Sequence, residues 1–234
     1  MTAIDRENLV YAKGKINPID LEERIMFSFL PKPEGQILDI GCGVGNITKK
    51  IQSLGFSVNG VDFSEEAIKK AMTRIPAKCW DLDKGIPFNN NSFDIVWAGD
   101  VIEHVFDPIG LLEEINRVLK KDGHLFLSVP NDFNIYKRIN VIFSGKSIQS
   151  NLYRRRKQCK HHTYFSLELL EYMLSQNNFL IDSFYAIWKM PMLHKFFNIE
   201  KKRVTKVKKI GELFGNTFIL NTIKIQPAHA PEQA

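Results

Sequence analysis

The sequence predicts an α/β protein built on a doubly wound, mostly parallel sheet. Apolar segments typical of strands alternate with amphipathic segments typical of helices from residue 36 to residue 131. A glycine-rich turn joins the first strand to the next helix in ILDIGCGVGNITKKI, residues 37–51. Strands that alternate with helices favour a parallel sheet. A strand, a glycine turn and a helix in succession are typical of a nucleotide-binding edge.

Helix-capping and turn residues set the expected elements in chain order. Asn17-Pro18 predicts a helix over about 18–30, and Ser64 caps another over 64–74. Glycines are expected to close two further helices, one at Gly55 and one at Gly123. The expected strands are 36–40, 57–63, 77–82, 93–99 and 124–131, and the remaining expected helices are 46–55 and 107–123.

The pattern of expected elements changes in the last third of the chain. A helix is expected over 166–178, followed by strands over 179–188 and 215–225. Because no helix-rich crossover separates these two strands, the final one is expected to pair antiparallel. Residues 1–226 are predicted to form a single domain with a lid insertion at about 132–160, and 227–234 a flexible tail.

Composition narrows the class of protein. The chain has 234 residues, which suits one domain, and no run of about 18 apolar residues that a membrane span would need. The N-terminal residues lack an apolar secretory core, so a cytoplasmic location is expected. Cys42, Cys79 and Cys159 lie far apart and are expected to be reduced thiols.

The net charge of +6 is concentrated in two stretches. Residues 132–160 carry eight basic residues against Asp132, and 195–209 carry seven against Glu200, so the rest of the chain is net acidic. A local basic patch indicates an anionic acceptor or peripheral contact with a membrane. Within the lid, Ile135, Ile139 and Ile142 fall at helical spacing. A solvated lid helix is the alternative interpretation.

Three features at successive strand ends indicate a nucleotide-like ligand. Gly41, Gly43 and Gly45 form the first, but Asn46 occupies the place of the third glycine of a dinucleotide loop. Asp62 follows Gly41 by twenty-one residues, where a carboxylate accepts ribose hydroxyls, and Asp81 ends the next strand. Each feature has an alternative interpretation: the glycines form an ordinary turn, Asp62 supplies a charge at the N-terminus of the next helix, and Asp81 is a turn aspartate.

These residues carry a resemblance to a known family. ILDIGCGVG, VDFS, DLDKGIPFNNNSFDIVWAGDVIEHVFDP and RVLKKDGHLFLSVPN resemble the class I S-adenosylmethionine-dependent methyltransferases. The likeness covers about 36–131 and resumes at HHTYFSLELLEYMLSQNNF. It is similar to the small-molecule enzymes of ubiquinone biosynthesis and of glycan gene clusters. The resemblance implies a seven-stranded sheet with an antiparallel last strand, and S-adenosylmethionine as the cofactor.

The resemblance also implies a role for particular residues. Gly41 and Gly43 would let the backbone approach the methionine part, with Asp39 near its ammonium. The ribose and adenine would be held by Asp62, Phe63, Asp81 and Leu82, and the sulfonium end would be lined by Ala98 and Gly99.

Transfer to an oxygen also needs a base beyond the fourth strand. The candidates are Glu103 and His104 in GDVIEHV, and His161 or its neighbour His162 in KHHTYFS. His104 has an alternative role in packing the loop. Asp100, Glu103 and His104 are also similar to a divalent-metal site of ubiquinone-type enzymes, but an exposed helix-start cluster is the preferred interpretation, and no metal site is predicted.

The predicted function is therefore O-methylation of a small-molecule, sugar or lipid-linked acceptor. A nicotinamide-dependent oxidoreductase and a non-catalytic cofactor-binding module are the alternatives. No NPPY or PCQ motif is present, and aromatic residues do not interleave regularly with the basic ones, so no nucleic-acid partner is expected. The sequence does not indicate an oligomeric state.

Overall fold

A computed structural model describes residues 21–144, 161–189, 202–206 and 208–226 of the chain. The elements in order are α2 (Leu21–Ser28), β1 (Gln36–Ile40), α3 (Asn46–Ser53), β2 (Ser57–Asp62), α4 (Glu65–Ala71), β3 (Ala77–Cys79), η1 (Leu82–Lys84), β4 (Phe93–Gly99), η2 (Ile102–His104), α5 (Pro108–Val118), β5 (Leu119–Pro130), α6 (Ile135–Ser144), α8 (Leu167–Gln176), β6 (Phe179–Lys189), β7 (Lys202–Thr205), α10 (Lys208–Phe214) and β8 (Thr217–Lys224).

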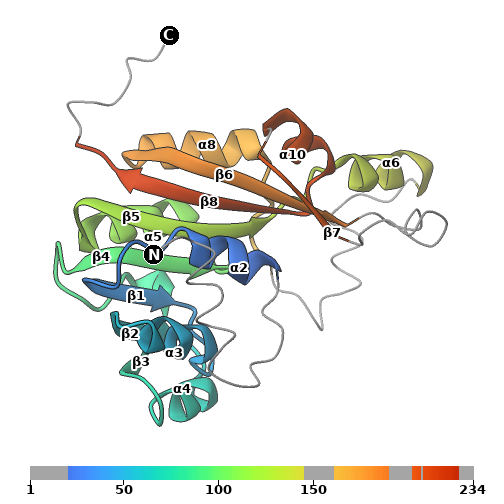
Figure 1. The fold of residues 1–234 in the computed structure, drawn as a ribbon. Helices are drawn as coiled ribbons and strands as arrows, with labels where there is room; N and C mark the ends of the chain where they lie inside the picture. The colour runs from blue at the N-terminus through green and yellow to red at the C-terminus, as the bar shows by residue number, and fades with distance from the viewer. Residues whose placement is uncertain (1–20, 145–160, 190–201, 207, 227–234) are drawn as a thin grey trace.

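All the strands described belong to one sheet in the order β3-β2-β1-β4-β5-β8-β6-β7 (Figure 1). Strands β1 to β5 pair parallel, and β8 pairs antiparallel with β5 and β6. The direction of winding reverses between β1 and β4, since β2 and β3 lie on one side and β5 on the other. In open α/β sheets, ligands bind outside the carboxyl ends of the strands at such a reversal.

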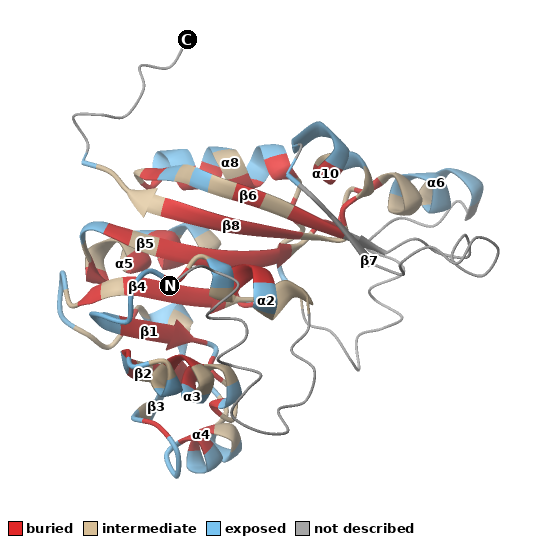
Figure 2. Cartoon of the chain, in the orientation of Figure 1, coloured by how far each residue is buried: buried red, intermediate tan, exposed pale blue. Residues whose placement is uncertain are grey.

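Helices cover both faces of the sheet. On one face, residues of α2, α3 and α4 pack with Ile37, Ile95 and Trp97 of the strands. On the other, α5 and α8 pack with Leu38 and Val96. The central strands are therefore buried on both sides, as Figure 2 shows, and read as nearly continuous apolar runs.

The helix starts follow the expected capping chemistry. Ser64, Asp107 and Ser166 each accept a hydrogen bond from a backbone N–H of the following first turn. Pro108 stands in the first turn after Asp107, where its missing N–H costs nothing. The caps thus fix where α4, α5 and α8 begin relative to the ends of the preceding segments.

The predicted architecture is confirmed, with three local corrections. The seven expected strands correspond to β1–β6 and β8, and β8 is antiparallel as predicted. The short strand β7 pairs with β6 as an eighth member, and β7 and α10 lie in or next to the basic 195–209 stretch, for which no element was predicted. Strand β3 ends at Cys79, three residues before the expected end at 82.

The helix expected over 107–123 ends at Val118, and this part of the prediction was wrong. Leu119 is fully buried and pairs with Phe93, so the chain enters β5 five residues early. Gly123 does not close a helix. A Cβ there would lie 2.9 Å from the carbonyl oxygen of Lys120, so glycine is required by a close backbone approach.

Several sequence predictions fall outside the described residues. They are the start of the first helix before residue 21, the lid from 145 to 160 with its arginines, residues 190–201 and the tail 227–234. No helix within the described ranges has the length and apolar character needed to cross a membrane.

A buried asparagine organises the end of β5. The Asn131 side chain donates to the carbonyl oxygens of Glu212 (2.8 Å) and Gly215 (3.0 Å) and accepts from the Phe133 N–H (2.9 Å). Its own N–H donates to the carbonyl oxygen of Asn216, and the residue has no exposed surface. This single side chain therefore ties the turn after β5 to the turn before β8.

Replacing Asn131 with alanine is expected to lower the free energy of unfolding by about 2–4 kcal/mol, since three buried backbone groups lose their partner. The exposed Asn89→Ala variant is the control and is expected to cost under about 0.5 kcal/mol. Urea unfolding of both variants measures the difference. Equal midpoints would contradict the structural role of Asn131.

Candidate active site

The glycine turn after β1 presents open space at one position. Gly41, Gly43 and Gly45 have φ values of +69°, +54° and +78°, in the left-handed region. A Cβ at Gly41 would lie 2.4 Å from Val101, so that glycine is needed for internal packing. A Cβ at Gly43 would meet no atom within 4 Å. Gly43 is thus the point of the turn where a ligand has room to approach the backbone.

Asp62 faces this turn from the end of β2. One carboxylate oxygen accepts from the Gly43 N–H at 2.9 Å and the other from the Ser64 N–H at 2.8 Å. Each oxygen keeps a second acceptor position. The next side chain, Phe63, is 80% exposed and so leaves its ring free to stack on a ligand. The pair matches a ribose acceptor beside an adenine-stacking ring.

Asp39 lies beneath the same turn. Its carboxylate is buried and accepts from the Thr48 hydroxyl of α3 at 2.5 Å. Burial raises the pKa of Asp39 to about 7, the Thr48 hydrogen bond opposes this, and the charge of Asp62 raises it further. A ligand ammonium nearby would favour the ionised carboxylate. Asp39 thus links the end of β1 to α3, and its place near a ligand ammonium stays a prediction.

The other cofactor candidates, Asp81, Leu82, Ala98 and Gly99, differ in their surroundings. Asp81 caps η1 by accepting from the Asp83 N–H, and its carboxylate lies 3.5 Å from the Lys84 ammonium. Leu82 packs against the core. The Ala98 side chain is buried in the core, so only its backbone can face a ligand, whereas Gly99 has ordinary space around its α-carbon.

The cradle fits the cofactor that the sequence resemblance implies. It combines an open approach at Gly43, a carboxylate at Asp62, an exposed ring at Phe63 and a buried carboxylate at Asp39. No side chain of the described residues blocks the approach at Gly43, and the polar groups suit a zwitterion joined to a nucleoside. Asn46 starts α3 as an ordinary helical residue.

A second group of polar side chains lies beyond β4. Glu103 of η2 is 1% exposed, and its Oε2 atom has no hydrogen-bond partner among the residues that the structure describes. Burial raises the pKa of Glu103 to about 8, and the charges of Asp100, Asp132 and Glu22 raise it further. Asp100 has φ +51°, and its N–H is shared between the carbonyl and hydroxyl oxygens of Ser128.

The segment 161–165 brings His161 to Glu103. The N–H of His162 donates to the Glu103 carbonyl oxygen at 2.7 Å, and Asp132 N–H donates to Phe165. The rings of His161 and His104 pack edge to face at 4.8 Å. Burial and the nearby His104 lower the pKa of His161, which keeps its imidazole neutral at pH 7.

The donor atoms of Glu103, His104 and His161 lie within 4.8 Å of one another, a set that could hold a divalent cation. His161 replaces Asp100 in the three-residue set suggested by the sequence resemblance. The absence of a metal site stays a prediction.

Sequence reasoning missed Asp132 and Lys137. Asp132 is buried, its Oδ1 accepts from the Lys137 ammonium at 2.7 Å, and its Oδ2 has no hydrogen-bond partner in the described part of the chain. Asp132 lies two residues beyond the end of β5, and Asp62 is the last residue of β2, so the same strand-end argument would have found Asp132. It completes a row of acidic residues along this edge of the sheet.

Several known proteins are similar to this chain in sequence or in fold. Residues 18–183 match the model of a family described as a methyltransferase domain. The chain is 34% identical over 119 residues to the mitochondrial ubiquinone biosynthesis O-methyltransferase of Bos taurus, covering 47% of this chain and 32% of that protein. It is 34% identical over 102 residues to the ubiquinone biosynthesis O-methyltransferase of Caulobacter vibrioides, covering 41% of this chain and 40% of that protein.

The chain thus matches about a third of the length of the first of these relatives and well under two thirds of the second. Among solved structures, a methyltransferase of Thermotoga maritima described as a possible histamine N-methyltransferase superposes with a TM-score of 0.61 at 23% identity, covering 95% of each chain. One from Archaeoglobus fulgidus gives 0.58 at 21%, covering 94% of each. At these identities the superpositions show a shared fold.

Gly43→Val is expected to weaken binding of S-adenosylhomocysteine at least about tenfold, because the side chain fills the open approach and a β-branched residue is strained at φ +54°. Gly55→Val is the control, since Gly55 also has positive φ but lies away from the turn. Calorimetry on both folded variants measures the affinity. Equal losses would show that backbone strain alone is responsible.

Glu103→Gln is expected to flatten the dependence of stability on pH. A carboxyl whose pKa is raised by folding stabilises the protein below about pH 4.5 and loses that contribution as pH rises toward 8. The wild-type unfolding free energy should therefore fall by about 1–3 kcal/mol more than that of the variant between pH 5 and 8. Exposed Glu113→Gln is the control. Parallel curves for wild type and Glu103→Gln would contradict the raised pKa.

Proposed function

The chain belongs to the methyltransferase-domain family, the class I S-adenosylmethionine-dependent methyltransferases, and from that premise we propose that it methylates a hydroxyl oxygen of a small organic acceptor. The observation that carries the proposal is the neutral, partly buried His161 beside Glu103, at the same edge of the sheet as the cofactor cradle. The relatives named as ubiquinone biosynthesis O-methyltransferases support an oxygen acceptor.

The oxidoreductase alternative is not supported. The family match is to a methyltransferase domain, and Asn46 stands where a dinucleotide loop has its third glycine.

S-adenosylmethionine, when bound, supplies an activated methyl group on its sulfonium. Gly43 and Asp62 orient the nucleoside and methionine parts along the edge of the sheet. His161 accepts the hydroxyl proton of the acceptor as the new carbon–oxygen bond forms. Because its pKa is lowered by burial, His161 is ready to accept that proton at neutral pH.

The charges around His161 support an acceptor whose reacting end is uncharged. Asp100 and Asp132 both lie close enough to Glu103 to raise its pKa, and the Lys137 ammonium is already engaged by Asp132. Glu103, with its pKa raised to about 8, is mostly uncharged at pH 7, but the carboxylates of Asp100 and Asp132 would repel a phosphate placed beside them. Buried carboxylate oxygens without partners, at Glu103 and Asp132, can instead accept hydrogen bonds from hydroxyl groups.

An anionic acceptor was suggested by the arginines at 154–156, which lie outside the described residues. A phenol or sugar hydroxyl that is attached to a lipid tail is compatible both with the basic residues of the predicted lid and with the acidic residues around His161. We therefore favour a lipid-linked hydroxyl compound as the natural acceptor.

His161→Gln is expected to lower kcat/KM for methylation of catechol, used as a soluble probe, by about 100-fold or more, because the base is lost. His162→Gln is the matched control, since this neighbouring ring is exposed and packs on Phe106 at 4.1 Å. The affinity for S-adenosylhomocysteine should remain near wild type in both variants.

In the wild type, the rate should rise with pH through an ionisation below about 6.5, the ordinary histidine value. Release of S-adenosylhomocysteine measures turnover. Similar losses in the two histidine variants, or no transfer to any hydroxyl compound in a panel of phenols and sugars, would contradict the proposal.

A further inference from the structure

Helix α6 presents its apolar residues to solvent. Ile139 is 42% exposed, Ile142 74% and Phe143 85%. These residues fall at i, i+3 and i+4, so they share one face of the helix, and Arg138 lies at the edge of that face. In Figure 2 the described part of α6 shows no buried residue, whereas α5 and α8 turn their apolar faces into the core. We call Arg138, Ile139, Ile142 and Phe143 the outer face of α6.

The orientation of this face is fixed by the first turn of the helix. Lys137 donates through its ammonium to the Asn131 carbonyl oxygen (2.8 Å) and to Asp132 (2.7 Å). Asn134 accepts from the Lys137 N–H, and the Arg138 guanidinium donates to the Phe133 carbonyl oxygen. These contacts anchor α6 to the buried turn after β5, and α6 projects beyond the sheet in Figure 1. The outer face is therefore a defined surface of the fold.

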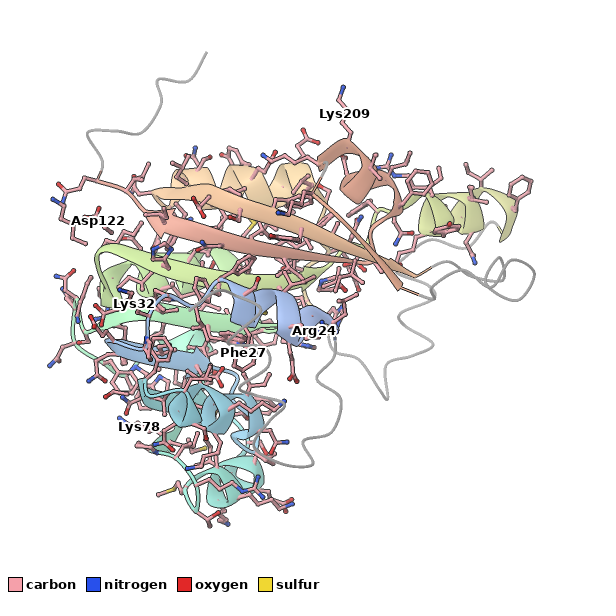
Figure 3. The ribbon with its side chains drawn as sticks, in the orientation of Figure 1. Arg24, Phe27, Lys32, Lys78, Asp122 and Lys209 are labelled. Atoms are coloured by element: carbon pink, nitrogen blue, oxygen red, sulfur yellow. The ribbon has the colours of Figure 1, made fainter. Side chains whose placement is uncertain are left out.

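The charge of the adjoining chain indicates what covers this face. The sixteen residues from 145 to 160 hold six basic residues and no acidic one. On neighbouring α10, Lys209 also stands out from the molecule (Figure 3). A second protein copy would bring the same positive charge to the contact. An anionic lipid surface accepts the apolar side chains and the positive charges together.

We propose that the outer face of α6 docks on an anionic lipid membrane, with Ile142 and Phe143 entering the boundary between headgroups and acyl chains. Lys137 links α6 to Asp132, which lies close enough to His161 to influence its charge. The membrane-facing helix and the reacting end are therefore neighbours. If the proposed function holds, on which this part of the inference rests, a lipid-linked acceptor reaches His161 from the bilayer.

The test is flotation of the full chain with vesicles of phosphatidylglycerol and phosphatidylcholine, or of phosphatidylcholine alone. Wild type should float with the anionic vesicles, and the bound fraction should fall with added salt. The double variant Ile142→Asn, Phe143→Ser should weaken partitioning about tenfold or more. The matched control, Leu169→Asn with Tyr172→Ser, removes two exposed apolar residues from α8 and should bind as wild type.

Three outcomes would overturn the inference. They are the absence of flotation with anionic vesicles, equal loss in the α8 control, and a change of oligomeric state in the α6 variant, which would show that a second copy covers the face. Calorimetry with S-adenosylhomocysteine should give equal affinities for all variants and so verifies folding. Flotation needs no turnover, so a membrane-bound chain that methylates no hydroxyl compound would refute the proposed function and leave the docking surface standing.

Discussion

Parallel pairing of β1 with β2 on one side and β4 on the other is the constraint on which the rest of the structure depends. In this register Asp39 lies opposite Gly60 and Trp97, so the chain leaves each strand at the same edge. The glycine turn, Asp62 and Gly99 therefore lie at the same edge of the sheet, although no short sequence pattern links them. A one-residue slip in the pairing of a strand would turn the side chains of that strand to the opposite face of the sheet. It would disrupt both the core and the cofactor cradle.

The same edge concentrates buried acidic side chains. Asp39, Glu103 and Asp132 are all at least nine-tenths buried, and the pKa values of Asp39 and Glu103 are raised mainly by burial. Thr48 and Lys137 each compensate one carboxylate, but Glu103 keeps an oxygen without a partner. Such groups are expensive to bury, and active sites are where proteins most often retain them. The unpaired carboxylate oxygens therefore point to ligand hydroxyls at this edge.

The helices show how similar patterns lead to different roles. α5 and α6 both have apolar residues at helical spacing, but α5 buries Leu111, Leu112 and Ile115 against the sheet. α6 is held beyond the sheet by the ties of its first turn to the segment 131–134, so its apolar side chains face outward. The spacing of apolar residues defines a face, and only the anchoring of the helix decides what that face meets.

The sequence by itself determined the order of the elements, the antiparallel β8, the glycine turn and the acidic residue at the end of β2. These follow from local periodicity, capping and strand-end chemistry, which act over a few residues. The tertiary structure decided the end of α5, because the burial of Leu119 against Phe93 overrides its helical pattern. It also decided that His161, 57 residues beyond His104, lies against that ring, and that Gly41 serves packing while Gly43 stays open. Contacts between residues far apart in the chain depend on how the elements pack, which no short sequence pattern specifies.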